Sequence, residues 1–204
     1  MLVDAKHIGY RYRKDRWVLK DVSMHVEEGE IVGLVGPSGY GKTTLGRILA
    51  GYLQPHEGQL TFQGKPYQQF QGYHPIQIVL QHPEKAVNPR WKMKEILTEG
   101  WSPNQELLTS LGIEEEWLSR WPNELSGGEL QRFCVARALG PQTKLLIADE
   151  MTTMLDAVTQ AQIWHTVLDI VKQRKMGLIV ISHDKHLINR MSTRVVDLQK
   201  INQA

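Results

Sequence analysis

Hydrophobic and polar residues alternate in two early segments of the chain and then run together in a third. Partial alternation over residues 2–10 and 18–26 predicts two antiparallel strands, each with one face in the core. Residues 31–35 are apolar without a break, which is typical of a strand buried on both faces of a sheet. Similar short apolar strands are predicted at residues 76–80, 145–148, 178–181 and 195–198.

Helical patterns fill several intervals between these strands. A helix is predicted over residues 42–50, stopped by Gly51, and a longer one over residues 157–174. In the longer helix, Ile163, Val167, Ile170 and Val171 recur at helical spacing and form a stripe that faces the core. Because strands and helices alternate, we expect an α/β fold with a mainly parallel sheet and an N-terminal antiparallel β-subdomain.

The middle of the chain has a different pattern. Residues 83–139 contain no convincing strand and instead show helical patterns at 93–98, 105–111, 115–121 and 130–139. This block is predicted to be a helical subdomain inserted into a single domain of residues 1–204. Residues 1–82 and 140–204 would then form the core around it.

Composition and charge narrow the class of protein. With 41% hydrophobic residues the 204-residue chain can bury a substantial core, and its net charge of +2 gives no reason to expect a nucleic-acid partner. The single Cys134 cannot form an internal disulfide, the N-terminus lacks a signal pattern, and the apolar runs are far shorter than the ~20 residues that cross a bilayer. We therefore expect a cytoplasmic protein that serves a membrane, if at all, from outside it.

Residues 36–43 fit the pattern G-x-x-x-x-G-K-[ST], and they lie between the buried strand at 31–35 and a predicted helix. The glycines let the backbone curl, so that N-H groups and the helix N-terminus form an anion site. Lys42 would reach the β- and γ-phosphates, and Thr43 would hold Mg²⁺. The alternative is a glycine-rich turn with a chance lysine. The ATP-binding residues predicted here are Gly36, Ser38, Gly39, Gly41, Lys42, Thr43 and Thr44.

A second acidic element follows the apolar strand at residues 145–148. Asp149 and Glu150 would emerge at the carboxyl end of the sheet, on the edge where the glycine-rich loop lies. Asp149 can help to bind Mg²⁺, and Glu150 is then the natural base for polarising a water that attacks the γ-phosphate. The alternative is an acidic pair that merely ends a strand in solvent. With the loop at Gly36, the pair predicts a P-loop NTPase.

Residues 125–129, Leu-Ser-Gly-Gly-Glu, followed by Leu130-Gln131-Arg132, resemble the signature motif of ABC ATPases. Ser126, Gly127 and Gly128 stand ahead of a helix, where exposed N-H groups can take a γ-phosphate. The resemblance covers roughly residues 2–199 and implies the ABC ATPase fold. In that family the signature of one subunit closes over the P-loop of the other, so the partner would be a second ABC ATPase domain, identical or related.

The resemblance assigns four further residues. Tyr12 matches the aromatic that stacks on adenine, with Trp17 as a rival and packing on the core as the alternative. Gln81 matches the glutamine that contacts Mg²⁺ and water and links the site to the membrane subunit. Asp156 resembles the D-loop aspartate, although it can also cap the following helix. His183 lies where that family has the switch histidine, which donates to the γ-phosphate.

Three departures from the family pattern stand out: Glu129 where glutamine is commoner, Met154 in a Thr-Met pair where Ser-Ala is usual, and Tyr40 where a small residue is frequent. None removes a group that does chemistry, so the resemblance implies a competent ATPase. Its catalytic residues would be Glu150, His183, Lys42 and Gln81, with ATP and Mg²⁺ as cofactors.

Residues 81–90 and 95–97 look like the Q-loop region of dipeptide, oligopeptide and nickel importers. This implies a peripheral protein on the cytoplasmic face of the cell membrane, with integral permease subunits, an extracytoplasmic binding protein, and peptide or nickel chelate as cargo. The alternative is a soluble ABC ATPase of repair or translation, but such proteins usually carry two ABC domains or a coiled coil. A regulatory nucleotide module is disfavoured because Glu150 and His183 are both present.

Overall fold

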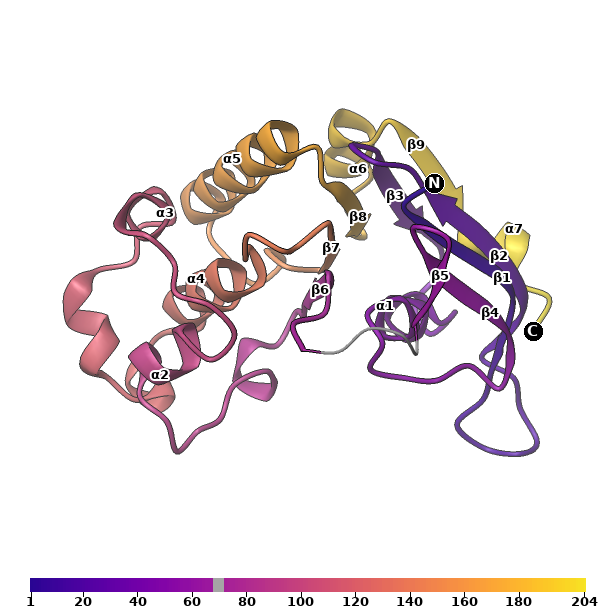
Figure 1. Ribbon diagram of the computed structural model, residues 1–204, viewed down its shortest axis with the longest axis horizontal. Coiled ribbons are helices and arrows are strands. Elements are labelled where there is room, and N and C mark those ends of the chain that lie inside the picture. The colour runs from indigo at the N-terminus through magenta and orange to yellow at the C-terminus, as the bar shows by residue number, and fades with distance from the viewer. Residues whose placement is uncertain (68–71) are drawn as a thin grey trace.

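The computed structural model describes residues 1–67 and 72–204 (Figure 1). Its strands are β1 (Val3–Tyr10), β2 (Leu19–Val26), β3 (Ile31–Val35), β4 (Glu57–Phe62), β5 (Lys65–Pro66), β6 (Ile76–Val79), β7 (Leu145–Asp149), β8 (Gly177–Ile181) and β9 (Arg194–Asp197). Its α-helices are α1 (Lys42–Leu49), α2 (Met93–Leu97), α3 (Gln105–Ser110), α4 (Gly127–Ala138), α5 (Ala157–Arg174), α6 (Lys185–Met191) and α7 (Leu198–Ile201). Short 3₁₀ helices are η2 (Pro83–Lys85), η3 (Glu115–Ser119) and η4 (Pro122–Glu124).

Five strands form a parallel sheet in the order β6-β7-β8-β3-β9. Every residue of β7 and β8 is buried, as expected of apolar strands covered on both faces. The carboxyl ends of the five strands therefore meet along one edge of the sheet. The predicted apolar strands are confirmed, with ends shifted by about one residue.

The first two strands are antiparallel, as predicted, and belong to a second sheet in the order β2-β1-β4-β5. The hydrophobic pattern predicts neither β4 nor β5. In β4 only Phe62 is fully buried, so this strand lacks the hydrophobic alternation that would mark it.

The two sheets enclose α1 within one of two hydrophobic clusters. Leu45 and Ile48 of α1 pack there with Ile147 and Ile179 from one face of the parallel sheet and with the inner face of the antiparallel sheet. Residues of the other face, such as Leu146, pack in the second cluster with α4 and α5. The parallel sheet is thus covered on both sides, with helices on one and α1 and a sheet on the other (Figure 1).

The segment 83–139 is helical, as predicted, and lies at the left of Figure 1. The predicted helix at 115–121 is instead the short 3₁₀ helix η3, and α4 begins three residues before the predicted 130. Within the described ranges, no helix is both long enough and apolar enough to span a membrane.

Candidate active site

The loop of residues 36–41 connects the end of β3 to the start of α1. Gly39 and Gly41 have φ angles of 78° and 95°, a left-handed region that glycine adopts without strain. A Cβ on Gly41 would also come within 2.8 Å of the Leu19 side chain. The backbone therefore requires glycine here, and a curled loop ahead of a helix N-terminus is an arrangement that binds phosphate.

Lys42, the first residue of α1, is turned into this loop. Its side-chain Nζ donates to the carbonyl oxygens of Gly36 at 2.8 Å and Pro37 at 3.0 Å, and the residue is only 6% exposed. Burial lowers the pKa of the Lys42 ammonium, while the charges of Glu150 and Asp149 oppose that shift. The lysine therefore places a positive charge inside the loop, close to two carboxylates.

Asp149 ends β7 and is 4% exposed. Burial raises the pKa of its carboxyl, and a hydrogen bond from the Thr43 side chain acts in the opposite direction. Within the described residues no three His, Cys, Asp or Glu side chains gather to hold a metal. A hydroxyl beside one carboxylate nevertheless fits Mg²⁺, which in phosphoryl-transfer sites uses one or two carboxylates together with substrate phosphates.

Glu150 is held in an unusual conformation immediately after β7. Its φ is 51°, and its backbone N-H donates to the carbonyl of Ile181 at 2.9 Å, which extends the pairing with β8 by one residue. Its Oε1 lies 2.8 Å from Nε2 of His183, and its side chain is 15% exposed. Such a left-handed conformation costs a non-glycine residue roughly 1–2 kcal/mol. The fold thus directs this carboxylate toward His183 rather than along the strand.

His183 follows β8, the neighbouring strand of the sheet, and half of its side chain is exposed. Glu150 and His183 line one side of a cavity of about 220 Å³, whose wall also includes Thr152, Gln160 and Trp164. Gln160 and Trp164 donate to the buried Thr152 hydroxyl at 2.9 and 3.0 Å. This polar part of the wall is therefore fixed by hydrogen bonds, and Glu150 lines the same cavity.

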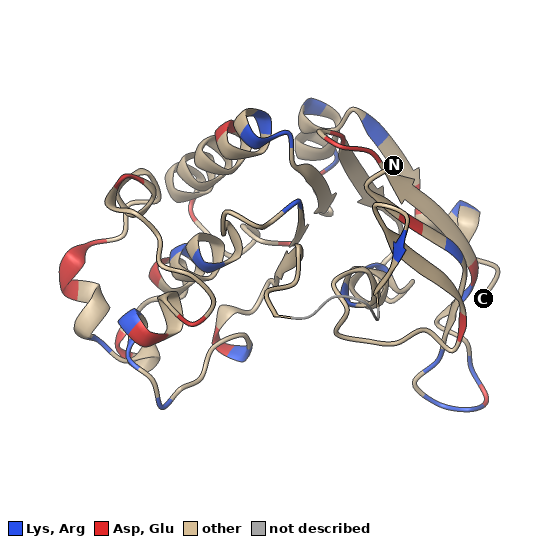
Figure 2. Cartoon of the chain, viewed as in Figure 1, with Lys and Arg blue, Asp and Glu red and all other residues tan. Residues whose placement is uncertain are grey.

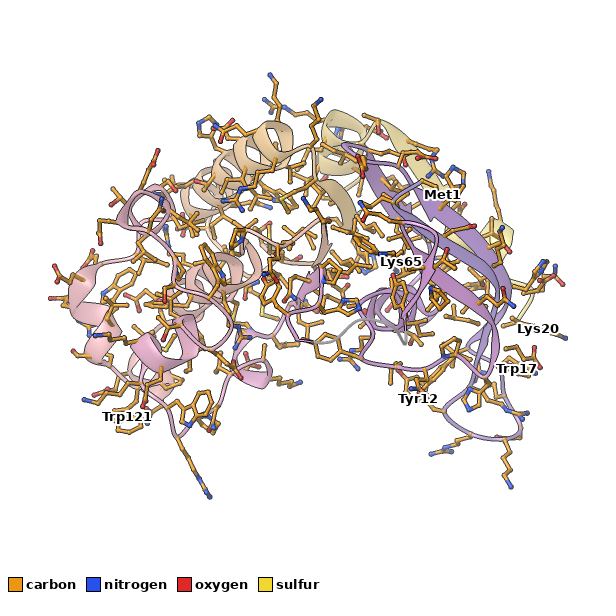
Figure 3. All side chains as sticks on the ribbon, viewed as in Figure 1. Met1, Tyr12, Trp17, Lys20, Lys65 and Trp121 are labelled. Atoms are coloured by element: carbon orange, nitrogen blue, oxygen red, sulfur yellow. The ribbon has the colours of Figure 1, made fainter. Side chains whose placement is uncertain are left out.

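Tyr12 lies on the loop between β1 and β2, near the start of α1. Its hydroxyl is 3.2 Å from the Thr44 hydroxyl and its ring packs edge-on against Tyr10, with centroids 5.0 Å apart. The residue is 58% exposed, so it is not a core residue. The rival Trp17, labelled with Tyr12 in Figure 3, has the Arg11 guanidinium 4.7 Å from its ring centroid. Tyr12 therefore offers the more open aromatic face.

The same loop carries several positive charges. The blue segment at the lower right of Figure 2 belongs to this loop, where Arg13, Lys14 and Arg16 are exposed around Asp15. These charged side chains therefore form a solvated face of the loop.

The signature residues begin α4. Ser126 is the N-cap: its hydroxyl accepts from the Glu129 N-H at 3.2 Å, and Glu129 Oε2 accepts from the Ser126 N-H at 2.6 Å. This reciprocal capping box works with glutamate or glutamine at its fourth position, so Glu129 keeps the cap that the commoner glutamine can also make. The first N-H groups of a helix have no partner within it, so Gly127 and Gly128 leave donors available.

Gln81 and Asp156 lie at two other loops. Gln81 is half-buried and lies two residues after the end of β6, at the same sheet edge as Asp149. Asp156 caps α5, since its carboxylate accepts from the N-H groups of Val158 and Thr159, both at 3.0 Å. Hydrogen bonds from the Thr159 N-H and side chain, and from the Val158 N-H, lower the pKa of the Asp156 carboxyl. The expected capping role is thus present.

The carboxyl edge of the sheet gathers Lys42, Thr43, Asp149, Glu150 and His183. The signature residues do not join them: α4 belongs to the helical half of the molecule and α1 to the other half (Figure 1). The pairing of His183 with Glu150 is not predicted from the sequence. Neither is a role for Gln131 within the signature segment, although a glutamine on the buried side of a helix signals a polar contact inside the protein.

Comparison with known proteins gives the family. The family described as ABC transporter matches residues 19–153. The chain belongs to the ABC transporter ATP-binding proteins. It is an ATPase of that family, with the α/β ABC ATPase fold.

Among relatives, the chain is 34% identical to the nickel import ATP-binding protein NikE of Rhodospirillum rubrum, covering 90% of this chain and 73% of that protein. It is 32% identical to the nickel import system ATP-binding protein NikE of Staphylococcus aureus, covering 97% and 87%. It is 30% identical to the oligopeptide transport ATP-binding protein OppF of Streptococcus mutans, covering 95% and 70%.

Among solved structures, the chain resembles a dimeric, post-hydrolysis ATP-binding cassette, MJ0796, bound to ADP and Pi. The TM-score is 0.81 at 25% identity, covering 96% of this chain and 94% of that one. That protein carries its hydrolysis products within a dimer. A putative ABC transporter ATP-binding protein from Pyrococcus furiosus gives a TM-score of 0.79 at 23% identity and supports the fold alone.

Proposed function

We propose that this ATPase powers import through separate membrane subunits, and that Glu150 is the base that polarises the attacking water. The observation that carries the base assignment is the 2.8 Å contact between Glu150 and His183 at the strand ends beside Lys42. In this proposal Lys42 and the loop N-H groups bind the phosphates, and His183 orients the Glu150 carboxylate and donates toward the γ-phosphate.

Mg²⁺ would be held by Thr43 and Asp149, with Gln81 as a further oxygen donor from the neighbouring strand end. The support is the hydrogen bond that places the Thr43 hydroxyl beside the buried carboxylate. When bound, the cation would neutralise charge on the phosphates. The chain's own contribution is to keep the Asp149 oxygen fixed at the end of β7.

The active arrangement is proposed to be a dimer of cassettes, each signature facing the other chain's loop. A Cβ on Gly127 would meet nothing within 4 Å, and one on Gly128 would meet only Leu155 at 3.4 Å. Packing in this chain therefore does not require glycine there, whereas close approach of a nucleotide from outside would. Met154 and Val158, 64% and 79% exposed beside Asp156, supply apolar surface for the same contact.

The membrane subunits would dock at the surface where β6 meets the helical half. A cavity of about 340 Å³ lies there, lined among others by Tyr52, Leu80, Ala86 and Arg137. Its wall includes Leu80, which precedes Gln81, and Ala86, two residues before the exposed segment 88–90. A permease seated there would contact the residues that follow β6. This would place the protein on the cytoplasmic face of the membrane, with an extracytoplasmic binding protein delivering peptide or nickel chelate.

Two variants test the hydrolytic site. The Glu150→Gln protein should bind ATP but turn it over at least about 100-fold more slowly, since general-base catalysis contributes roughly 10²–10⁴-fold. The Lys42→Ala protein should lose ATP binding itself. Wild-type turnover in the first variant, measured as phosphate release, would remove the base assignment; undiminished ATP binding in the second would remove that of the loop.

Two measurements test the transport proposal: co-purification of the chain with membrane subunits, and uptake of cargo by that complex. The tagged chain should be recovered from membranes with integral permease subunits, and vesicles holding that complex should take up one of the two cargo classes when ATP is supplied. Uptake of nickel and of short peptides is measured side by side, with the Glu150→Gln complex as the control. A complex that takes up neither would contradict the import proposal while leaving the ATPase assignment intact.

A further inference from the structure

Gln131 is a polar residue buried inside α4, only 2% exposed. Its side-chain Nε2 donates to the carbonyl of Met151 at 2.7 Å and to the carbonyl of Leu80 at 3.1 Å. Met151 directly follows Glu150, and Leu80 directly precedes Gln81. One amide group on the signature helix therefore touches the backbone beside two residues of the proposed site.

The two carbonyls lie where the hydrogen bonds between β6 and β7 have ended, so the Gln131 amide supplies donors that the ladder does not. The pairing of β6 with β7 ends at Val79 and Ala148. Leu80 and Met151 thus lie just past the ladder, where their carbonyls need other donors. A primary amide supplies two N-H groups on one atom, one for each carbonyl. Gln131 therefore forms hydrogen bonds to the segments that follow two neighbouring strands, β6 and β7.

The orientation of the amide follows from the same contacts. Nitrogen and oxygen of a glutamine side chain are assigned from hydrogen bonding rather than from shape. The opposite orientation would set Oε1 against two carbonyl oxygens, so the donor must face them. No protein donor in the described part of the chain meets Oε1. Donation to the two loops is therefore the contact that this side chain makes.

We propose that Gln131 is a positioning residue that couples the signature end of α4 to Glu150 and Gln81. This rests on the proposed function, since it takes the roles of Ser126, Glu150 and Gln81 from there. Gln131 lies five residues after the Ser126 cap on one continuous helix. A displacement of α4, caused by a nucleotide at its N-terminus, is passed by the Nε2 hydrogen bonds to both loops. The residue thus acts on the base without contacting the nucleotide.

The first test separates positioning from binding. Gln131→Met keeps the length of an unbranched side chain and removes both donors. We expect kcat to fall at least about 10-fold, because misplacing a reacting group by 1 Å can cost about 100-fold, while KM for ATP changes less than about 2-fold. Wild-type kcat in a folded Gln131→Met protein would overturn the proposal.

A matched control removes a different buried hydrogen bond far from the nucleotide. The Thr166 hydroxyl donates to the Ser110 carbonyl at 3.0 Å between α5 and the end of α3. Thr166→Val should lower the melting temperature but leave kcat within about 2-fold of wild type. An equal loss of kcat in both variants would assign the Gln131 effect to stability and overturn the proposal. If Gln131→Met does not fold, Gln131→Asn, which keeps the donors but has a shorter reach, takes its place with the same expectation.

The second test addresses coupling. In a double-mutant cycle of Ser126→Ala and Gln131→Met, a shared route makes the double variant about as slow as the slower single variant. If the fold-loss of kcat in the double variant equals the product of the two single fold-losses, the proposed coupling is overturned. Failure of the proposed function looks different: Glu150→Gln would then hydrolyse ATP normally, whereas failure of this inference leaves Glu150→Gln inactive and Gln131→Met active.

Discussion

Asp149 brings an acidic side chain into a nearly fully buried position at the end of β7. Burial raises the pKa of its carboxyl, which means that the folded protein disfavours the ionised form. A cation ligand must nevertheless be ionised. In the absence of nucleotide this residue therefore weakens the fold at neutral pH.

Asp149→Asn should stabilise the nucleotide-free protein at neutral pH and abolish hydrolysis. The melting temperature should rise by about 2–4 °C for each kcal/mol that the buried charge costs. A group with a raised pKa in the folded state favours folding below its unfolded pKa and loses that contribution as pH rises through the folded value. The gain over wild type should thus shrink on acidification and vanish below about pH 3.9. Calorimetry across pH checks this, and an equal gain at all pH values would contradict it.

Cys134 is a second buried titratable residue, but it takes no part in the proposed active site. It lies in the wall of the cavity that Ala86 also lines. Burial raises the pKa of its thiol to about 11, so that little thiolate exists at pH 8. A thiol reagent should modify the folded protein at least about 100-fold more slowly than the protein in urea, followed by absorbance. Fast labelling of the native state would show that the cavity opens readily.

At the scale of elements, one residue, Glu129, has two opposite effects at the N-terminus of the signature helix α4. The Glu129 carboxylate completes the capping box with Ser126, but it also places a negative charge beside the N-H groups proposed to receive a phosphate. A carboxylate in the first turn favours the helix by roughly 0.3–1 kcal/mol. It disfavours an anion in the same place by like-charge repulsion.

Glu129→Gln should therefore strengthen ATP-dependent dimerisation and lower stability by no more than about 1 kcal/mol, since glutamine can keep the capping box. Light scattering with ATP, in the Glu150→Gln background so that nucleotide is not consumed, measures the first effect. Glu124→Gln is the matched control: Glu124 Oε2 accepts from the Trp121 N-H at 2.7 Å in the same type of cap at η4. Equal effects of the two substitutions would show that local charge at Glu129 is not the cause.

The elements that could be predicted from sequence are those whose pattern reports burial. The parallel strands are continuous apolar runs. Of the predicted stripe on α5, Ile163, Val167 and Val171 are buried, and Ile170 is partly buried against the same cluster. β4 and β5 were not predicted because they are largely exposed and lack a hydrophobic pattern. α6 is only seven residues long, and its start depends on the Asp184 carboxylate, which accepts from His186 and Leu187 N-H groups. Such a local cap carries too weak a signal to stand out in one sequence.

The site was predictable to the extent that motifs specify it. Lys42, Thr43, Asp149 and Glu150 occur at spacings with a chemical reason, and the fold gathers them at one sheet edge. Contacts between residues far apart in the chain were not predictable: His183 with Glu150, and Gln131 with Leu80 and Met151. These contacts depend on which strands are neighbours, and the order β6-β7-β8-β3-β9 is a property of the whole sheet rather than of any one segment.

At the scale of the molecule, the proposed phosphate site and the signature lie in different halves of the protein. The carboxyl edge beside α1 holds the residues proposed for phosphate chemistry, and the helical half carries the signature (Figure 1). The cavity of about 340 Å³ lies between β6 and the helical half. Gln131 is a contact through which the helical half touches the backbone of that edge. A change in position of one half relative to the other would thereby reach both loops together.

The separation of Lys42 from Ser126 within one chain has a genetic consequence. If each working site takes its loop from one copy and its signature from another, two defective alleles can restore each other. A Lys42→Ala copy and a copy with a disabled signature, Ser126→Arg, are each inactive alone, but a mixed pair contains one site built from the intact loop of one and the intact signature of the other. Co-expression should recover ATP turnover that neither allele shows by itself, up to about half of the wild-type sites in each mixed pair. No recovery in purified mixed dimers would mean that each chain completes its own site.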